Sequence, residues 1–317
     1  MEHVLVVLPF RDEQKRKLEQ QAPDYQFQYV QKESLTKECL EWATILIGNV
    51  PFEYLSGNLH LKWVQLNNAG TEGYLDSLPD QCILTNATGA YGDIMGEHIL
   101  AMLFMLMKRL DQYYLEQRVE QWKPLEYVHS MRGANILVVG FGNIGQCFAK
   151  KANALGAQVY GIRKSVQDTP DYVIEMGTLS DLKRLLPKMD VVVSCLPGYH
   201  QTTQIFDRDC LLRMKKGAFF LNVGRGTVVD TDALVELLNE NYLGGAGLDV
   251  TDPEPLPLGH PLWKANRVIL TPHVSGQFHY PETMDKVIEI AIDNLRRFAT
   301  HQKMNNEIDF ETGYCKR

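Results

Sequence analysis

The segment around residues 135–155 restricts the possible folds more than any other part of the chain. The mostly apolar residues 135–139 predict a buried strand, and the stretch 147–155 predicts an amphipathic helix. Between them lies a G-x-G-x-x-G turn, Gly140-Phe141-Gly142-Asn143-Ile144-Gly145. Its first glycine permits a tight bend, its second permits close approach to a pyrophosphate, and its third permits close helix–strand packing. The segment therefore predicts a dinucleotide-binding domain whose phosphates lie at the start of the helix.

Short apolar runs alternate with longer amphipathic stretches along the chain, which is typical of an α/β protein with parallel sheets. In the first third, we expect strands at 4–8, 45–48, 63–66 and 83–85 and a helix at 11–20. A long helix from residue 96 to about residue 120 follows. After the strand at 135–139, we expect five more strands, at 158–162, 191–195, 218–223, 245–249 and 268–270, with helices at 147–155, 179–186, 207–214 and 231–239. A last helix is expected at 281–301, and the polar end at 306–314 is expected to return to the first domain.

Length, charge and cysteine content exclude several classes of protein. A chain of 317 residues suggests about two domains. A net charge of −7 argues against the basic surface that binding to nucleic acid or to an anionic membrane usually requires. The longest apolar run, 99–107, is shorter than a membrane span, and the first residues lack the basic start of a signal peptide. The six cysteines form no C-x-x-C pair, which favours free thiols in a cytoplasmic protein over disulfides or a metal site.

The residues after the second strand of the dinucleotide domain indicate which cofactor binds. In an NAD site, an acidic residue about 20 positions beyond the glycine turn accepts hydrogen bonds from the ribose 2′-hydroxyl. Here the strand is followed by Arg163, Lys164 and Ser165. An arginine can form paired hydrogen bonds with a phosphate, the lysine adds charge, and the serine adds a hydroxyl donor. We therefore expect NADP to be preferred, with NAD as the alternative cofactor.

Three later loops each hold one ionisable side chain between glycines or prolines. They are 222–226 with Arg225, 249–255 with Glu254 and 271–276 with His273. Because parallel strands end at one edge of a sheet, we expect these side chains at the ligand-binding edge. Arg225 can bind a carboxylate, His273 can exchange a proton with a carbonyl oxygen, and Glu254 can hydrogen-bond the imidazole and favour its protonated form. The set predicts reversible hydride transfer to a 2-oxo acid.

These motifs resemble those of the D-2-hydroxyacid dehydrogenase family over most of the chain. The resemblance implies a Rossmann-type doubly wound parallel sheet at 100–285, inserted into a smaller flavodoxin-like α/β substrate domain at 1–99 and 286–317. The motifs that carry it are Gly96-Glu97-His98, Met131-Arg132-Gly133, Gly140–Gly145, Asp190–Pro197, the Arg225 loop, 246–250, Pro253-Glu254-Pro255, Thr271-Pro272-His273 and Ile308-Asp309 with Gly313-Tyr314.

The resemblance also implies roles for individual residues. Arg225 would bind the substrate, His273 would be the acid/base, and Glu254 would be its partner. Asp249 would contact the nicotinamide carboxamide. Further cofactor-binding residues would be Gly140, Gly142, Asn143, Ile144, Gly145, Cys195, Leu196, Pro197, Val223, Gly224, Arg225, His273 and Gly276. The substrate would contact His273, and its carboxylate would lie opposite Arg225 on backbone N–H groups of Ala69, Gly70 and Thr71. A homodimer is implied, with 96–120 as its contact.

Substrate identity and catalysis itself leave alternatives open. The chain has Thr71-Glu72 where many relatives carry Val-Asp, and Gln277-Phe278 where many carry a small or hydroxylated residue. We favour a glyoxylate/hydroxypyruvate reductase or a broader 2-oxo-acid reductase over a phosphoglycerate dehydrogenase or a formate-oxidising enzyme. The alternative hypothesis is an NAD(P)-sensing, corepressor-like or scaffold protein on the same fold without significant turnover.

Overall fold

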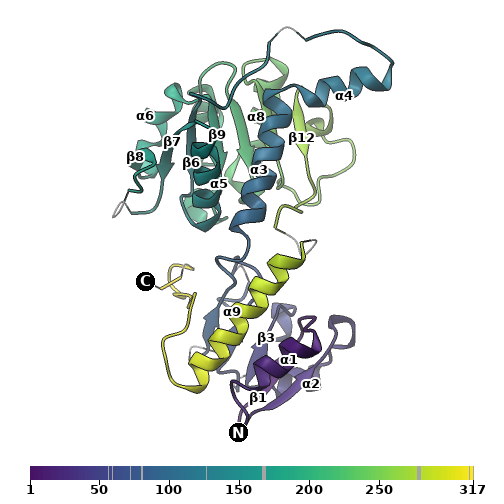
Figure 1. The fold of residues 1–317 in the computed structure, drawn as a ribbon, viewed down its shortest axis with the longest axis vertical. Coiled ribbons are helices and arrows are strands. Elements are labelled where there is room, and N and C mark those ends of the chain that lie inside the picture. The colour runs from purple at the N-terminus through teal and green to yellow at the C-terminus, as the bar shows by residue number, and fades with distance from the viewer. Residues whose placement is uncertain are drawn as a thin grey trace. The chain divides into compact units, whose positions relative to one another are not determined.

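The chain forms two compact units, and the first is built from both ends of the chain (Figure 1). It comprises Met1–Ala90 with Phe278–Arg317, and the second unit comprises Tyr91–Gln277. The sequence places these boundaries at 99/100 and 285/286. The structure, a computed structural model, describes residues 1–55, 57–58, 60–71, 73–79, 81–125, 127–165, 169–276, 280–313 and 315–316.

Local packing explains where the division falls. Residues 92–99 begin helix α3 (Gly92–Met107), which packs on helix α5 (Asn143–Ala154) of the second unit. A Cβ on Gly92 would lie 2.5 Å from Asn143 Oδ1 and 2.6 Å from Cys147 Sγ, so the glycine allows close contact with these α5 side chains. At the other boundary, Asp285 on helix α9 (Pro281–Ala299) accepts hydrogen bonds from Arg11 at 2.7 Å and Gln14 at 2.9 Å, which ties α9 to the first unit.

The first unit contains a five-stranded parallel sheet in the order β2-β1-β3-β4-β5. Its strands are β1 (His3–Val6), β2 (Gln26–Tyr29), β3 (Ile45–Ile47), β4 (Trp63–Gln65) and β5 (Ile83–Thr85), with helices α1 (Asp12–Glu19) and α2 (Lys37–Trp42). This order is the flavodoxin-like one. The chain end returns to this sheet as expected, since the Ile308 N–H donates to Leu84 O at 2.8 Å. The prediction missed β2, which lies at the edge of the sheet and alternates glutamines with aromatic residues.

The described residues of the second unit form a seven-stranded parallel sheet in the order β12-β11-β10-β9-β6-β7-β8. This is a Rossmann order, and the strand order reverses between β6 and β9, where such sheets bind their ligands. The strands are β6 (Asn135–Val139), β7 (Gln158–Ile162), β8 (Val173–Gly177), β9 (Val191–Ser194), β10 (Phe219–Asn222), β11 (Gly245–Leu248) and β12 (Val268–Leu270). The expectation of six strands was wrong because β8 is an edge strand whose middle residues are not buried.

The remaining helices of this unit include α6 (Leu182–Leu185), α7 (Arg208–Leu212) and α8 (Thr231–Asn239). The single helix expected at 96–120 was wrong, because the segment divides into α3 and α4 (Leu110–Arg118). Between them Arg109 adopts a left-handed conformation with φ of 57°. The Leu106 carbonyl, which would accept from residue 110 in a continuing helix, instead accepts from the Arg109 N–H at 3.2 Å and from the guanidinium of Arg267.

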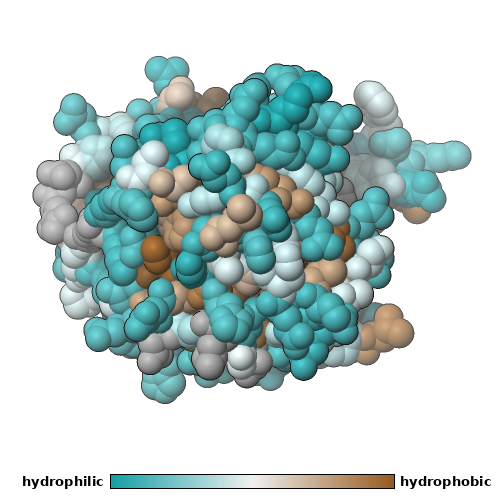
Figure 2. Space-filling model, turned by 90° about the horizontal axis from the view of Figure 1, so that it is seen from below, coloured by the Kyte–Doolittle hydropathy of each residue, from teal (hydrophilic) through white to brown (hydrophobic). Residues whose placement is uncertain are grey.

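The core of each unit lies against its sheet, and polar residues cover much of the surface. Strand residues such as Leu46, Val64, Leu137 and Val192 are fully buried. On the face shown in Figure 2, hydrophilic residues form most of the rim and hydrophobic ones gather near the centre. Among the residues that the structure describes, no helix combines the length and apolar character that crossing a bilayer requires.

Candidate active site

The glycine turn joins β6 to α5 at the point where the strand order reverses. Gly140 has φ of 97°, and a Cβ on it would lie 2.7 Å from Cys195 O. A Cβ on Gly145 would lie 2.4 Å from Gly140 O, so neither position accepts a side chain without a shift of backbone. Gly142 differs, because a Cβ there would meet open space. Gly142 and Asn143 are exposed and Ile144 is half-buried, so the start of α5 is available to an anion.

The end of β7 is joined directly to this turn. The N–H groups of Gly140 and Phe141 both donate to Ile162 O at 2.9 Å. Arg163, Lys164 and Ser165 follow Ile162 immediately, and the Arg163 N–H donates to Gly177 O at 3.1 Å. The basic and hydroxyl-bearing residues 163–165 therefore lie beside the glycine turn, where a dinucleotide-binding domain contacts the adenosine ribose.

The loops after β9 and β10 pack against each other at the same edge. A Cβ on Gly224 would lie 2.2 Å from Leu196 O, which brings the segment 195–197 against Val223 and Gly224. Burial raises the pKa of Cys195 to about 12. Its side chain is therefore a neutral thiol at physiological pH, suited to packing rather than to nucleophilic chemistry.

The loop that carries Arg225 is held by its own backbone and by the loop after β11. The buried Asn222 side chain donates to Arg225 O at 2.8 Å and accepts from the Gly224 N–H at 3.1 Å. The Arg225 guanidinium donates to Gly224 O at 2.9 Å. A Cβ on Gly226 would lie 1.9 Å from Thr251 O, so the Arg225 loop is in tight contact with the loop that carries Glu254.

Asp249 follows β11 and organises the loop that contains His273. Its side chain is fully buried. Asp249 Oδ1 accepts from Thr271 Oγ1 at 2.6 Å and from the Val274 N–H at 2.9 Å, and Oδ2 accepts from the Ser275 N–H at 3.1 Å. Burial alone would raise the pKa of Asp249, but the hydrogen bonds from Ser275, Thr271 and Val274 outweigh it and lower the pKa below its ordinary value. Asp249 is therefore a carboxylate at neutral pH.

His273 and Glu254 form a pair on the exposed side of this loop. The distance from His273 Nδ1 to Glu254 Oε1 is 2.5 Å, and the side chains are 44% and 40% exposed. Because a carboxylate only accepts, the proton between them belongs to Nδ1. His273 has φ of 52°, and its N–H donates to Asp249 O at 2.8 Å. The left-handed backbone conformation of His273 is thus held by Asp249, which also binds the rest of the loop.

Two polar residues in this network were not assigned a role from the sequence. Thr271 contacts Asp249, and His98 on α3 lies with Nε2 3.1 Å from Thr271 Oγ1. The sequence contains both in short motifs, but the contact joins α3 to the loop after β12, far away along the chain. Only the folded structure brings them together. Gly276 closes the same loop, and a Cβ on it would lie 3.2 Å from Met95 Sδ.

The candidate substrate loop lies in the first unit, after β4. Ala69 O accepts from Asn86 Nδ2 at 2.7 Å, and Gly70 is half-buried. Thr71 is buried, and its Oγ1 has no hydrogen-bond partner within the described part of the chain. The sequence motifs also include Glu72, Gln277, Phe278 and Tyr314, which lie outside the described residues.

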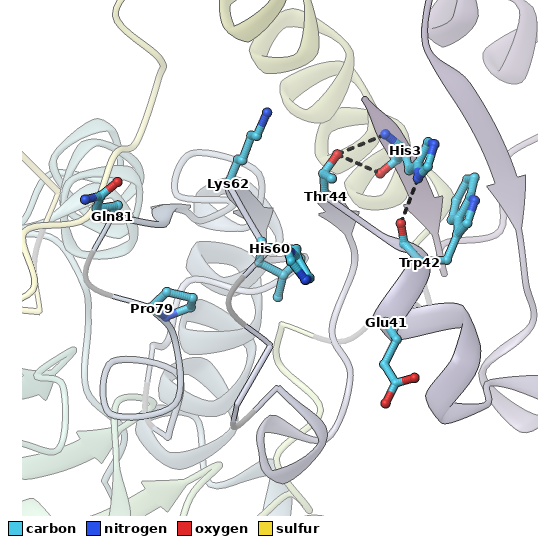
Figure 3. Close-up of a pocket in the computed structure, with 9 residues that line it drawn as sticks. His3, Glu41, Trp42, Thr44, His60, Lys62, Pro79 and Gln81 are labelled. Carbon is cyan, nitrogen blue, oxygen red and sulfur yellow. Dashed lines mark hydrogen bonds between the residues drawn. The ribbon is translucent and has the colours of Figure 1, made fainter. Parts of the chain in front are cut away.

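A pocket of about 740 Å³ in the first unit holds none of the candidate residues (Figure 3). His3 stacks on Trp42 at 4.5 Å between ring centroids, and its Nδ1 lies 2.9 Å from Trp42 O. His3 begins β1, Thr44 precedes β3 and Lys62 precedes β4, so the pocket lies at the amino ends of the strands. Open α/β sheets bind ligands at the opposite, carboxyl ends.

Comparison with known proteins points to one family. A family model described as "D-isomer specific 2-hydroxyacid dehydrogenase, NAD binding domain" matches residues 100–275. A glyoxylate reductase of Thermofilum pendens is 32% identical over 217 residues, which cover 67% of this chain and 63% of that protein. Glyoxylate/hydroxypyruvate reductase A of Serratia proteamaculans is 28% identical over 277 residues, which cover 85% of this chain and 87% of that protein.

The fold has a counterpart among solved structures. The structure of a D-isomer specific 2-hydroxyacid dehydrogenase family protein from Aeromonas salmonicida superposes with a TM-score of 0.86 and 29% identity. The match covers 98% of this chain and 99% of that one. The likeness therefore extends over both units and is not restricted to the dinucleotide-binding part.

Proposed function

Because the chain belongs to the D-isomer specific 2-hydroxyacid dehydrogenase family, we propose that it reduces a small 2-oxo acid to the D-2-hydroxy acid by hydride transfer. We infer further that it prefers NADPH and that glyoxylate, hydroxypyruvate or a similar compound is its substrate. The second unit would be the dinucleotide-binding domain, and the first unit would be the substrate domain. The observation that carries the proposal is the His273–Glu254 pair, with Nδ1 and Oε1 2.5 Å apart.

His273 would act as the general acid of the reduction. Glu254 holds the proton on Nδ1, so the doubly protonated ring would present an N–H at Nε2 to the substrate carbonyl oxygen. Delivery of that proton leaves a neutral ring, and the reverse oxidation returns it. Glu254 stabilises the charged ring because the two groups carry opposite charges. The pair is partly exposed, which allows the ring to regain its proton from solvent after each turnover.

Arg225 would bind the substrate carboxylate and polarise the carbonyl group. Its backbone is held by Asn222, and its loop packs closely against Thr251 at Gly226. Positioning of this kind lowers the barrier because the reacting groups are already oriented. In the first unit, we propose that backbone N–H groups of Ala69, Gly70 and Thr71 bind the substrate.

The residues of the second unit fit a nicotinamide dinucleotide. The open space over Gly142 and the exposed start of α5 suit a pyrophosphate. We propose that the Asp249 carboxylate accepts from the carboxamide N–H of the nicotinamide. The remaining proposed contacts are Gly140, Asn143, Ile144, Gly145, Cys195, Leu196, Pro197, Val223, Gly224 and Gly276. When bound, the reduced dinucleotide supplies the hydride. Arg163, Lys164 and Ser165 would recognise its 2′-phosphate, which supports the preference for NADPH over NADH.

We also propose that the protein is a homodimer. Several apolar side chains of α4 and the segment after it are exposed, namely Leu110, Tyr114, Leu115, Val119 and Trp122. Clusters of exposed apolar side chains are typical of a protein–protein interface. A cytoplasmic location is supported by the cysteines, all of which are free thiols.

The test is a panel of substrates with both cofactors. NADPH and NADH oxidation are followed with glyoxylate, hydroxypyruvate, pyruvate and a bulky 2-oxo acid, and the product is analysed on a chiral column. We expect turnover of the small acids, faster with NADPH, and a D product where the product is chiral. Tight binding of NADPH without turnover of any compound would instead support a dinucleotide-sensing scaffold.

A further inference from the structure

A hydrogen-bonded relay runs from helix α3 to the carboxylate of Asp249. His98 is on α3, Thr271 follows β12 and Asp249 follows β11. The distances are 3.1 Å from His98 Nε2 to Thr271 Oγ1 and 2.6 Å from Thr271 Oγ1 to Asp249 Oδ1. Helix α3 is pressed against this sheet, since a Cβ on Gly247 would lie 3.2 Å from Met102 Cβ. His98 therefore contacts the loop after β12 from a helix that is closely packed on the sheet.

The direction of each hydrogen bond follows from the number of available protons. A threonine hydroxyl has one proton, and the ionised Asp249 can only accept, so that proton points to Asp249 Oδ1. Oγ1 then offers a lone pair to His98, and Nε2 of His98 must be the donor. Donation to Oγ1 fixes the hydroxyl rotor and strengthens the short bond to the carboxylate, because hydrogen bonds in a chain polarise one another.

The relay acts on one of the two oxygens of the buried Asp249 carboxylate. Oδ1 accepts from Thr271 and Val274, whereas for Oδ2 the structure gives one donor, the Ser275 N–H. His98 Nε2 also lies 3.8 Å from Oδ1. Thr271 and Val274 therefore hold Oδ1, Ser275 holds Oδ2, and together they fix the plane of the carboxylate.

We propose that His98 is a positioning residue for the nicotinamide end of the cofactor. It acts through Thr271 on Asp249, so that Oδ2 faces the carboxamide and the loop of His273 keeps its backbone conformation. This inference rests on the proposed function, and it assigns to α3 a part in catalysis that does not involve contact with substrate or cofactor.

Five single variants test the donor requirement. Gln places its amide nitrogen as many bonds from the backbone as His Nε2, so His98→Gln keeps the donor, whereas His98→Leu and His98→Asn remove it from that position. Thr271→Ser keeps the hydroxyl and Thr271→Val removes it. Glu97→Gln is the matched control, because Glu97 directly precedes His98 on α3 and its side chain is exposed.

The measurements are kcat and the dissociation constants of NADPH and of ADP-ribose 2′-phosphate, which lacks the nicotinamide. In His98→Leu, His98→Asn and Thr271→Val we expect NADPH binding and kcat to fall about tenfold, the effect of one lost hydrogen bond to a charged network. Binding of ADP-ribose 2′-phosphate should stay within twofold. His98→Gln, Thr271→Ser and Glu97→Gln should resemble the unaltered protein. The double variant His98→Leu/Thr271→Val should be no worse than Thr271→Val alone.

Two results would overturn the inference. One is a His98→Leu variant with unaltered kcat and NADPH affinity. The other is an equal loss of affinity for NADPH and ADP-ribose 2′-phosphate, which would indicate a general defect of the fold. If the unaltered protein itself failed to bind NADPH and NADH, the proposed function would fail and the inference with it. Normal turnover by both the unaltered protein and His98→Leu would reject the inference alone.

Discussion

The backbone of Gly226 passes so close to Thr251 that a Cβ on Gly226 would lie 1.9 Å from the Thr251 carbonyl oxygen. This contact joins the loop of Arg225 to the loop of Glu254. Two side chains proposed for one reaction are thereby linked through the backbone of their loops. The distance between the two loops therefore depends on Gly226, which has no side chain and takes no part in the proposed reaction.

Gly226→Ala should therefore damage both stability and catalysis. The added methyl group must push the two loops apart, and overpacking of this kind costs about 1–3 kcal/mol. We expect a lower thermal midpoint and a fall in kcat/KM for the 2-oxo acid. Calorimetry and steady-state kinetics check the two effects. An alanine variant as stable and as active as the unaltered protein would show that the loops tolerate separation.

Gly142→Ala should weaken cofactor binding without lowering the stability of the fold. A Cβ on Gly142 meets open space and its φ is −84°, so the fold has no reason to resist it. A dinucleotide pyrophosphate would occupy that space, and the methyl group should hinder its approach. We expect an unchanged thermal midpoint without cofactor and clearly weaker NADPH binding by titration calorimetry. Unaltered affinity would place the phosphates elsewhere.

Arg163→Asp should reverse the cofactor preference. The substitution removes a positive charge beside the glycine turn and introduces the acidic residue that hydrogen-bonds a ribose 2′-hydroxyl in NAD sites. The ratio of kcat/KM for NADPH to that for NADH should fall at least about tenfold, as expected for losing one charge-assisted bond. If the ratio did not change, Lys164 and Ser165 would be the groups that recognise the 2′-phosphate.

The lowered pKa of Asp249 predicts a pH dependence of stability. A carboxyl group whose pKa is lower in the folded state stabilises the fold above its unfolded pKa, and that contribution is lost as pH falls through the folded value. The difference in unfolding free energy between the unaltered protein and Asp249→Asn should be constant from pH 7 to about 5 and shrink below about pH 4. Urea denaturation at several pH values measures it. A difference that stays constant down to pH 3 would mean that Asp249 is not stabilised as a carboxylate.

The sequence predicts the parts of this protein whose signals are local. The strands β6, β7, β12 and the helix α8 have the expected limits because buried apolar runs and turn residues mark both ends. The edge strands β2 and β8 were missed because partly exposed strands lack that contrast. The break at Arg109 could not be foreseen, since Arg267, which takes the Leu106 carbonyl, comes from a distant part of the chain.

The same distinction applies to the site. Gly140, Gly145 and Gly224 belong to short motifs, and the structure shows the close backbone contacts that require them. The pairing of His273 with Glu254 was expected from the order of the loops and is present at 2.5 Å. The roles of Asn222 and Thr271 depend on hydrogen-bond directions, and the part played by His98 depends on how α3 packs. Such information is absent from a single sequence.

The most direct test of the account compares His273→Ala with the unaltered protein in NADPH oxidation driven by glyoxylate or hydroxypyruvate. General acid catalysis contributes a factor of about 10²–10⁴, so kcat should fall by that much in the variant. The NADPH dissociation constant should change little, because the imidazole lies on the exposed side of the loop. A variant that kept close to the original kcat would contradict the assignment of His273 as the proton donor.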